Sequence, residues 1–313
     1  MLAITRQTSV FATLLLIVTI AITFVRLYLN PFDVELQHCP YLPLWWQGVV
    51  SGVLMLTTGI VVNRTAVKMG ILGGFGTLPL SIFGFLSCGI LLSPDLLTAS
   101  AAAAIVAFGQ MFMLKSIVSI DDKQSLFTGT LCLGVAVIIY PPCAVLIGVL
   151  LVAIFIMPLS LRKIIIAFTG VALPLLGATY VHWYLGGAIT DVPQAFVNSI
   201  MGGCMMSFDS FPTITAALVL LTALVLIYGV INSFYHQYSM LVTIRKTLQL
   251  SAWLLLFALV GVALPSGGVT MVAVAAVPAT MVAAFAIDRM GQNSANIIYA
   301  LYLLLILAHL FLY

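Results

Sequence analysis

The chain has 313 residues, of which 63% are hydrophobic and only 6% are charged. A typical soluble domain has about 25% charged residues, so the composition excludes a soluble fold, which could not cover this much apolar surface. The net charge of +3 does not point to nucleic acid as a partner, because the positions of the charges matter more than their sum. Inside lipid every backbone polar group must be paired within its own segment, so long apolar runs predict an all-α polytopic membrane protein and not a barrel.

About eleven apolar segments follow one another without a soluble-sized insertion, which predicts a single integral membrane domain over residues 1–313. In chain order the predicted spans are Val10–Leu29, Trp45–Val62, Ile71–Leu92, Leu96–Leu114, two arms within 125–163, Ile164–Leu185, Ile214–Phe234, Leu250–Leu264, Val269–Ile287 and Asn296–Tyr313. Pro79, Pro174 and Pro278 lie inside three of these spans and predict kinks there.

The segment 125–163 predicts a membrane hairpin. It is apolar throughout, with Asp121, Asp122 and Lys123 before it and Arg162 and Lys163 at its end. Proline cannot donate a backbone hydrogen bond and disfavours helix in the residue before it, so Tyr140-Pro141-Pro142 ends one helix and starts the next. The arms are short for a membrane core of about 30 Å, and we expect the pair to lie inside a bundle.

The longest segment outside the predicted spans is 186–212. Phe196, Ile200, Met201, Met205 and Phe208 recur at roughly helical spacing, with polar residues between them. This pattern predicts an interfacial helix along the membrane surface, either as an ordinary connector or as a lid.

The signs of the charges predict the orientation. One set of alternate loops carries almost all of the basic residues, and the other set carries most of the acidic ones. Under the positive-inside rule the basic loops are cytoplasmic, so the amino terminus is inside and Tyr313 is outside. The basic residues are Arg6, Arg64, Lys68, Lys115, Lys123, Arg162, Lys163, Arg245, Lys246 and Arg289, and the acidic residues opposite are Asp33, Glu35, Asp95, Asp191 and Asp209.

The first outer loop holds the densest group of candidate site residues. Asp33 and Glu35 would act as a general base or hold a divalent cation, so whether the site binds a metal stays open. Arg26 would bind a phosphate or lipid headgroup. The alternatives are a solvated acidic loop and an arginine that extends to the headgroups. Cys39 and Cys204 fall in two outer loops, where a disulfide between them is a hypothesis. No cofactor motif is present, and no ionisable residue lies near the middle of a span.

Scattered residues carry a resemblance that covers most of the chain. They are Val62-Asn63-Arg64, 129–142, Arg162 with Gly170 and Pro174, Arg245-Lys246, and Pro278. In these the chain resembles an uncharacterised family of multi-pass inner-membrane proteins from gut and gliding Gram-negative bacteria. The resemblance implies a multi-pass protein of the bacterial inner membrane.

A looser similarity is to membrane glycosyltransferases that use polyprenyl-phosphate donors. Those enzymes have an acidic residue in the first outer loop, where Asp33 and Glu35 lie, although this loop of about fifteen residues is much shorter than theirs.

Three functions therefore stay open. They are a subunit or scaffold in cell-envelope biogenesis, a glycosyltransferase-like enzyme acting on a lipid-linked sugar at the outer face, and a facilitator or flippase. The expected partners are the lipid bilayer, a lipid-linked substrate and other envelope proteins. Glycine and proline in three spans favour the facilitator, because broken helices often line substrate paths.

Overall fold

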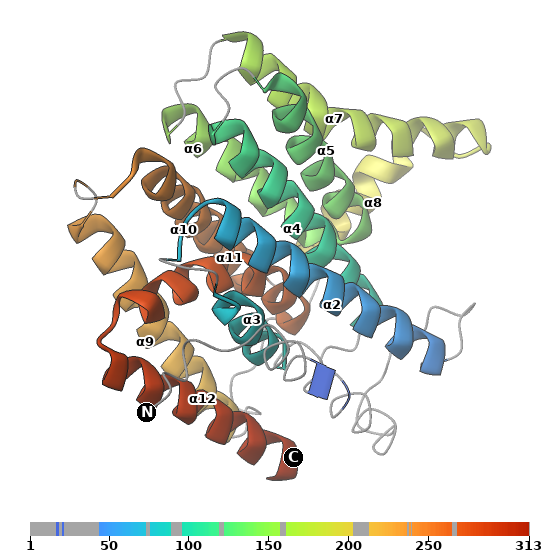
Figure 1. The fold of residues 1–313 in the computed structure, drawn as a ribbon. Helices are drawn as coiled ribbons and strands as arrows, with labels where there is room; N and C mark the ends of the chain where they lie inside the picture. The colour runs from blue at the N-terminus through green and yellow to red at the C-terminus, as the bar shows by residue number, and fades with distance from the viewer. Residues whose placement is uncertain are drawn as a thin grey trace.

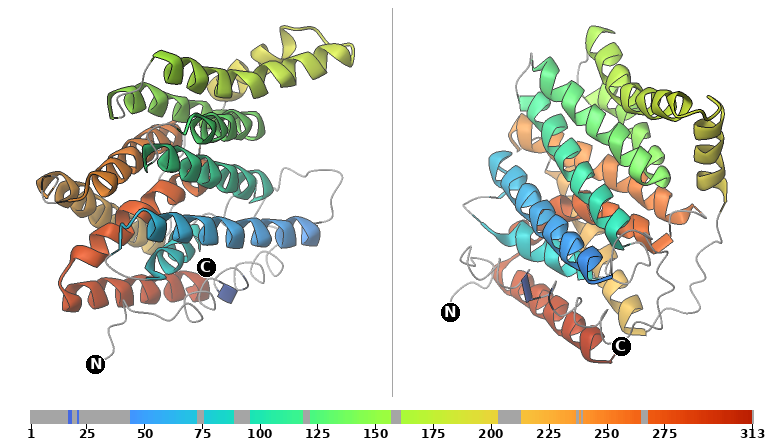
Figure 2. Two further views of the ribbon diagram at one scale, coloured as in Figure 1. Left: turned by 45° about the horizontal axis from the view of Figure 1, so that its top comes forward. Right: turned by 90° about the vertical axis from the view of Figure 1, so that its right-hand side faces the viewer.

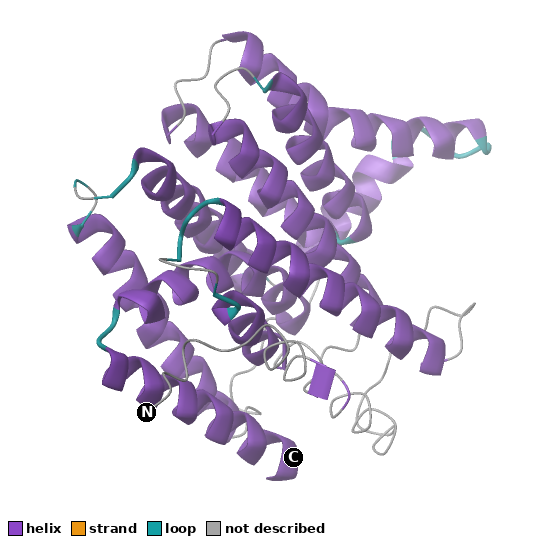
Figure 3. Ribbon diagram, viewed as in Figure 1, coloured by secondary structure: helices purple, strands orange, loops and turns teal. Residues whose placement is uncertain are grey.

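The computed structural model describes residues 17–18, 21, 44–72, 76–88, 96–118, 122–156, 161–202, 213–236, 238, 240–264 and 268–312. In these ranges all regular structure is helical (Figure 3). The helices are α2 Leu44–Lys68, α3 Leu78–Cys88, α4 Leu96–Val118, α5 Lys123–Ile139, the 3-10 helix η2 Pro141–Ile147, α6 Gly148–Ile156, α7 Leu161–Tyr184, α8 Asp191–Met201, α9 Thr213–Tyr235, α10 Val242–Ala263, α11 Gly268–Arg289 and α12 Gln292–Leu312.

Six of these helices, α2, α4, α7, α9, α10 and α11, are long and apolar enough to cross a membrane. Shorter apolar stretches of 10–17 residues lie in α3, α5, η2 with α6, and α12. The predicted all-α membrane bundle is therefore confirmed. The described helices do not support eleven spans, and the first predicted span lies almost entirely outside the described residues.

The surface of the bundle is apolar, as expected for contact with lipid. On α9 the large aliphatic side chains are each more than half exposed, namely those of Val219, Leu220, Leu224, Ile227 and Ile231. A protein in water rarely exposes an apolar patch of this kind, so lipid is the medium that fits this surface.

The centre of the bundle is α11, and 89% of its membrane-length apolar stretch is buried (Figure 1). It packs against α3, α4, α9 and α10. Many of its residues are alanines, which let neighbouring backbones approach closely. At Gly229 of α9, a Cβ atom would lie 2.9 Å from the Val282 carbonyl oxygen, so α9 and α11 are in backbone contact.

The third predicted span, Ile71–Leu92, is wrong in its start, while residues 89–92 lie outside the described residues. Gly70 ends the turn after α2 at a φ of +70°, and the helix begins only at Leu78 and ends at Cys88. Pro79 is the second residue of α3, where its missing N–H costs nothing, so it starts the helix and does not kink it. With 11 residues, α3 is about 16 Å long, roughly half of a membrane core.

The fold-back at Tyr140-Pro141-Pro142 is confirmed. Tyr140 is extended, and Pro141 and Pro142 open η2, in which the Cys143 N–H donates to the Tyr140 carbonyl at 3.0 Å. Gly170 faces Thr130, and Gly134 faces Val171 and Pro174. The helices α5 and α7 therefore run in the same direction. The segment that connects them in the sequence, η2 with α6, must run in the opposite direction.

The partner of the returning arm differs from a simple hairpin. α6 packs mainly on α10, and a Cβ at Gly148 would overlap the ring of Phe257. The sides of α5 are occupied by α4 and α7. The second arm, η2 with α6, therefore packs where a helix surface is free and not against the helix that precedes it in the sequence.

The helix α7 is half inside the bundle and half outside it. Its buried residues, Ala167, Gly170 and Val171, all precede Pro174. Beyond the proline the helix bends away from the bundle, and α8 turns back from its end (Figures 1 and 2). A helix-interior proline removes a backbone hydrogen bond and bends the helix, so the predicted kink is present here.

The basic residues gather at one end of the bundle. The ion pair of Lys115 with Asp122 joins the end of α4 to the start of α5. Gly261, near the end of α10, contacts Met271, near the start of α11, so the two helices are antiparallel and the start of α10 lies at the same end of the bundle as the end of α11. The helix ends concerned share the left side of Figure 1. Every described lysine and arginine lies in or next to these ends: Arg64, Lys68, Lys115, Lys123, Arg162, Lys163, Arg245, Lys246 and Arg289. The predicted gathering of the basic residues at one end is therefore present. Of the acidic residues predicted for the other end, the structure describes Asp191, and the side of the membrane that the basic end faces stays a prediction.

Candidate functional site

The site predicted in the first outer loop lies outside the described residues. This holds for Arg26, Asp33 and Glu35, and also for Cys39 and Cys204. Their roles, and the disulfide, therefore stay predictions. The described part of the chain brings polar groups together at three other places, one at each end of the bundle and one inside it.

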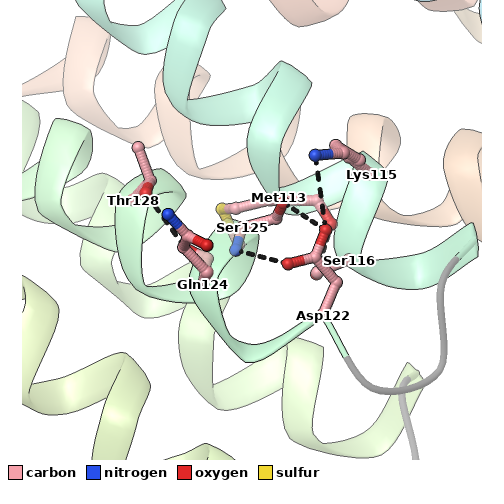
Figure 4. Close-up of polar contacts among 7 residues, drawn as sticks. All are labelled: Met113, Lys115, Ser116, Asp122, Gln124, Ser125 and Thr128. Carbon is pink, nitrogen blue, oxygen red and sulfur yellow. Dashed lines mark hydrogen bonds and ion pairs between the residues drawn. The ribbon is translucent and has the colours of Figure 1, made fainter.

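At the basic end, Asp122 joins α4 to α5 (Figure 4). It is the N-cap of α5, and its carboxylate accepts hydrogen bonds from the Ser125 N–H at 2.9 Å and from the Ser125 hydroxyl at 2.5 Å. The Lys115 ammonium lies 3.4 Å from the same carboxylate. An acidic N-cap satisfies backbone N–H groups that the first turn of a helix leaves unpaired.

These contacts stabilise the charged form of Asp122. The hydrogen bonds from Ser125 are the main cause, and Lys115 adds a smaller effect, so that the pKa of the Asp122 carboxyl is lowered to about 2. Asp122 precedes α5 and stays ionised at neutral pH. Its contacts are those of a structural clamp between two helices.

At the opposite end, His182 and Asp191 close the turn between α7 and α8. The His182 Nε2 atom lies 3.3 Å from the Asp191 carboxylate, which also accepts the Ala188 N–H at 2.9 Å. These contacts hold the pKa of Asp191 below its usual value, the Ala188 hydrogen bond being the larger cause. Gly186, at a φ of +96°, allows the sharp turn.

The segment 186–212 contains a helix, α8, Asp191–Met201, while its position along the membrane surface stays a prediction. Val192, Phe196 and Ile200 are partly buried at four-residue spacing, and Phe196 packs against the core. The polar side chains of Gln194, Asn198 and Ser199 are exposed. The helix therefore lies with its apolar side on the protein, where it contacts η2.

Inside the bundle, Gln110 of α4 and Ser251 of α10 form a polar pair. The Gln110 Nε2 atom donates to the Ser251 hydroxyl at 2.9 Å, and both side chains are almost fully buried. The Gln110 Oε1 atom has no hydrogen-bond partner. Sequence reasoning missed this pair because it looked for ionisable residues in the spans, and an uncharged glutamine in an apolar run was the available signal.

Aromatic residues of α12 pack against the short helix α3. The ring of Phe85 is 5.0 Å from that of Tyr299 and stacks on that of Tyr302 at 5.9 Å. The Tyr302 hydroxyl donates to the Thr222 hydroxyl of α9 at 3.1 Å. From Leu78 to Ser87, every side chain of α3 is buried.

Metal binding finds no support in the described part of the chain, which has no cluster of three or more His, Cys, Asp or Glu side chains. Cys143 is buried and Cys132 is half-buried, both as free thiols. Comparisons of the chain with protein-family models, curated proteins and solved structures find no match.

Proposed function

We propose that the chain is a multi-pass protein of the bacterial inner membrane that acts as a subunit or scaffold in cell-envelope biogenesis. The observation that carries this proposal is the second half of α7, which leaves the bundle at Pro174 (Figure 1). A scaffold needs a surface that its own chain leaves open for another protein. The arm formed by the second half of α7, residues 175–184, is such a surface.

The arm differs from the other apolar surfaces of the bundle. On α9, Val225 and Gly229 are buried against the bundle along one side of the helix. On the arm no side chain is buried, and a Cβ at Gly177 would meet nothing within 4 Å. Helices in lipid associate through close packing, so a half-helix with no fully buried side chain, on which Leu175 is the residue that packs against the core, is suited to a helix of a partner.

Photo-crosslinking in membranes tests this proposal. A photoreactive phenylalanine analogue replaces Leu176 on the arm or, as a control, Leu220 on α9, which are exposed to 68% and 63%. We expect a discrete protein adduct from position 176 and only lipid adducts from position 220. Lipid adducts alone from both positions would contradict the scaffold function.

A second candidate, a facilitator or flippase, is favoured by α3. This helix starts only at Leu78, after residues 71–72 and 76–77, which are not helical, and it is buried between α2, α11 and α12. Backbone that stops being helical at membrane depth is tolerated when it is enclosed by protein or lines a cavity. Interrupted helices of this kind often form the substrate paths of transporters.

Lipid transfer can be measured directly for this second candidate. Vesicles containing a fluorescent phospholipid are prepared with and without the purified protein, and the outer fluorophores are bleached with dithionite. Bleaching beyond the outer half in protein-containing vesicles would support a flippase. Equal bleaching in both samples would remove lipid flipping from consideration.

A further inference from the structure

The adjacent cations Arg245 and Lys246 differ from most basic residues at their end of the bundle. Both are half-buried in the first turns of α10, whereas Arg64, Lys68, Lys123, Arg162 and Arg289 are exposed. The positive-inside rule explains why cations lie at this end. It does not explain why two of them are withdrawn from water side by side.

Neither cation has an anionic partner within the described structure. Ion pairs of the described structure, such as Lys115 with Asp122 and His182 with Asp191, do not include them. Half-buried charge without a counterion is costly, so this place favours a negatively charged ligand.

The surface next to this pair is typical of a membrane interface. Tyr235 and Tyr238 are exposed between α9 and α10, as are Leu241 and Val242. Tyrosine is enriched where lipid headgroups meet hydrocarbon. His236 is the titratable neighbour in this connection, and its ring contacts that of Tyr235.

The geometry points to a binding site for an anionic phospholipid, with its phosphate at Arg245 and Lys246 and its acyl chains along α9. The exposed aliphatic residues of α9, Ile227 and Ile231, lead away from the basic end into the membrane. A soluble phosphate compound would match the cations but not this apolar surface. A phospholipid matches both, and basic pockets between membrane helices are a known form of headgroup site.

Native mass spectrometry measures the bound lipid. The protein is extracted from mixed vesicles of phosphatidylglycerol and phosphatidylcholine, and the retained lipids are counted for the wild type and for R245Q/K246Q. We expect the wild type to retain phosphatidylglycerol preferentially. The double variant should lower that preference by roughly thirtyfold, the order expected for two cations that each contribute about 1 kcal/mol at a membrane surface.

The matched control is R64Q/K68Q, which removes two exposed cations from the same end of the bundle. It should keep the preference, and an equal loss in both variants would overturn the site in favour of general surface charge. Inorganic phosphate that displaces the lipid at millimolar concentration would overturn the lipid assignment. If R245Q/K246Q does not elute as a single species in detergent, K246Q alone is measured, and an unchanged preference there would also contradict the site.

Discussion

The amide of Gln110 donates a 2.9 Å hydrogen bond to the hydroxyl of Ser251, joining α4 to α10 across 141 residues of sequence. The carbonyl oxygen of the same amide has no partner. The interior of a membrane offers no bulk water that could pair with this oxygen. The Gln110 amide therefore stabilises the contact of two helices through its N–H group and destabilises it through its unpaired oxygen. The contribution of each can be separated by substitution.

Ser251→Ala should destabilise the protein by about 1 kcal/mol, because it removes the interhelical hydrogen bond and leaves the whole amide unpaired. The double variant Q110L/S251A removes the amide as well and should recover most of that loss. Thermal unfolding in detergent measures both variants. A double variant less stable than Ser251→Ala alone would show that the amide stabilises the bundle by other contacts.

Gly129→Ala should destabilise the packing of α4 on α5. A Cβ at Gly129 would lie 2.8 Å from the side chain of Met113 and 2.9 Å from its backbone nitrogen, and overpacking of this kind costs about 1–3 kcal/mol. Gly177→Ala is the control, because its Cβ would meet nothing within 4 Å and alanine favours the helix by about 1 kcal/mol. The two substitutions should shift the unfolding temperature in opposite directions.

The clamp at Asp122 should make stability depend on acidic pH. Its pKa is lowered from 3.8 to about 2 in the folded protein, so its contribution is fully present above about pH 4 and is lost as the pH falls toward 2. Asp122→Asn should remove this part of the pH dependence of the unfolding temperature. Lys115→Met should keep most of it, because Ser125 is the larger cause of the shift.

Single cysteines at the two ends of α7 should react from opposite sides of the membrane. With all five native cysteines replaced by serine, Gln194→Cys on α8, which follows the far end of α7, should react with an impermeant maleimide in intact cells. Arg162→Cys should react only after the cells are permeabilised, if the basic end is cytoplasmic. The reverse pattern would invert the predicted orientation, and labelling of both from outside would contradict the path of α7.

The enzyme alternative can be tested through the first outer loop. If the protein acts on a lipid-linked sugar, Asp33→Asn and Arg26→Ala should each abolish complementation of a deletion strain while the protein remains inserted. Asp288→Asn is the control, because Asp288 is an exposed carboxylate next to Arg289 at the basic end of the bundle. Full complementation by both test variants would exclude catalysis by this loop.

Composition and proline positions predicted much of the fold. The low charge content indicated that lipid surrounds the protein, and segments in lipid must pair their own backbone groups, which predicted helices. Tyr140-Pro141-Pro142 located the fold-back because two prolines cannot continue a helix, and the spacing of Phe196 and Ile200 located α8.

Other features depend on shape, which hydropathy does not record. An apolar turn and an apolar helix have the same hydropathy, so the start of α3 at Leu78 was not visible in the run 71–92. A helix that is apolar on every side has no polar face to indicate its neighbour. The packing of α6 on α10 depends on the space that Gly148 leaves for Phe257, and a fit of that kind between residues far apart in the chain has no local signature.

The central position of α11 has a consequence for biosynthesis. This helix begins at Gly268 and yet packs against α3, α4, α9 and α10, all of which leave the ribosome before it. Until it enters the membrane, the earlier helices surround a place that their own side chains do not fill. Assembly of the bundle must therefore be completed late in translation, and a nascent chain that stops before α11 would expose to lipid, or to quality-control proteases, surfaces that the finished protein keeps inside.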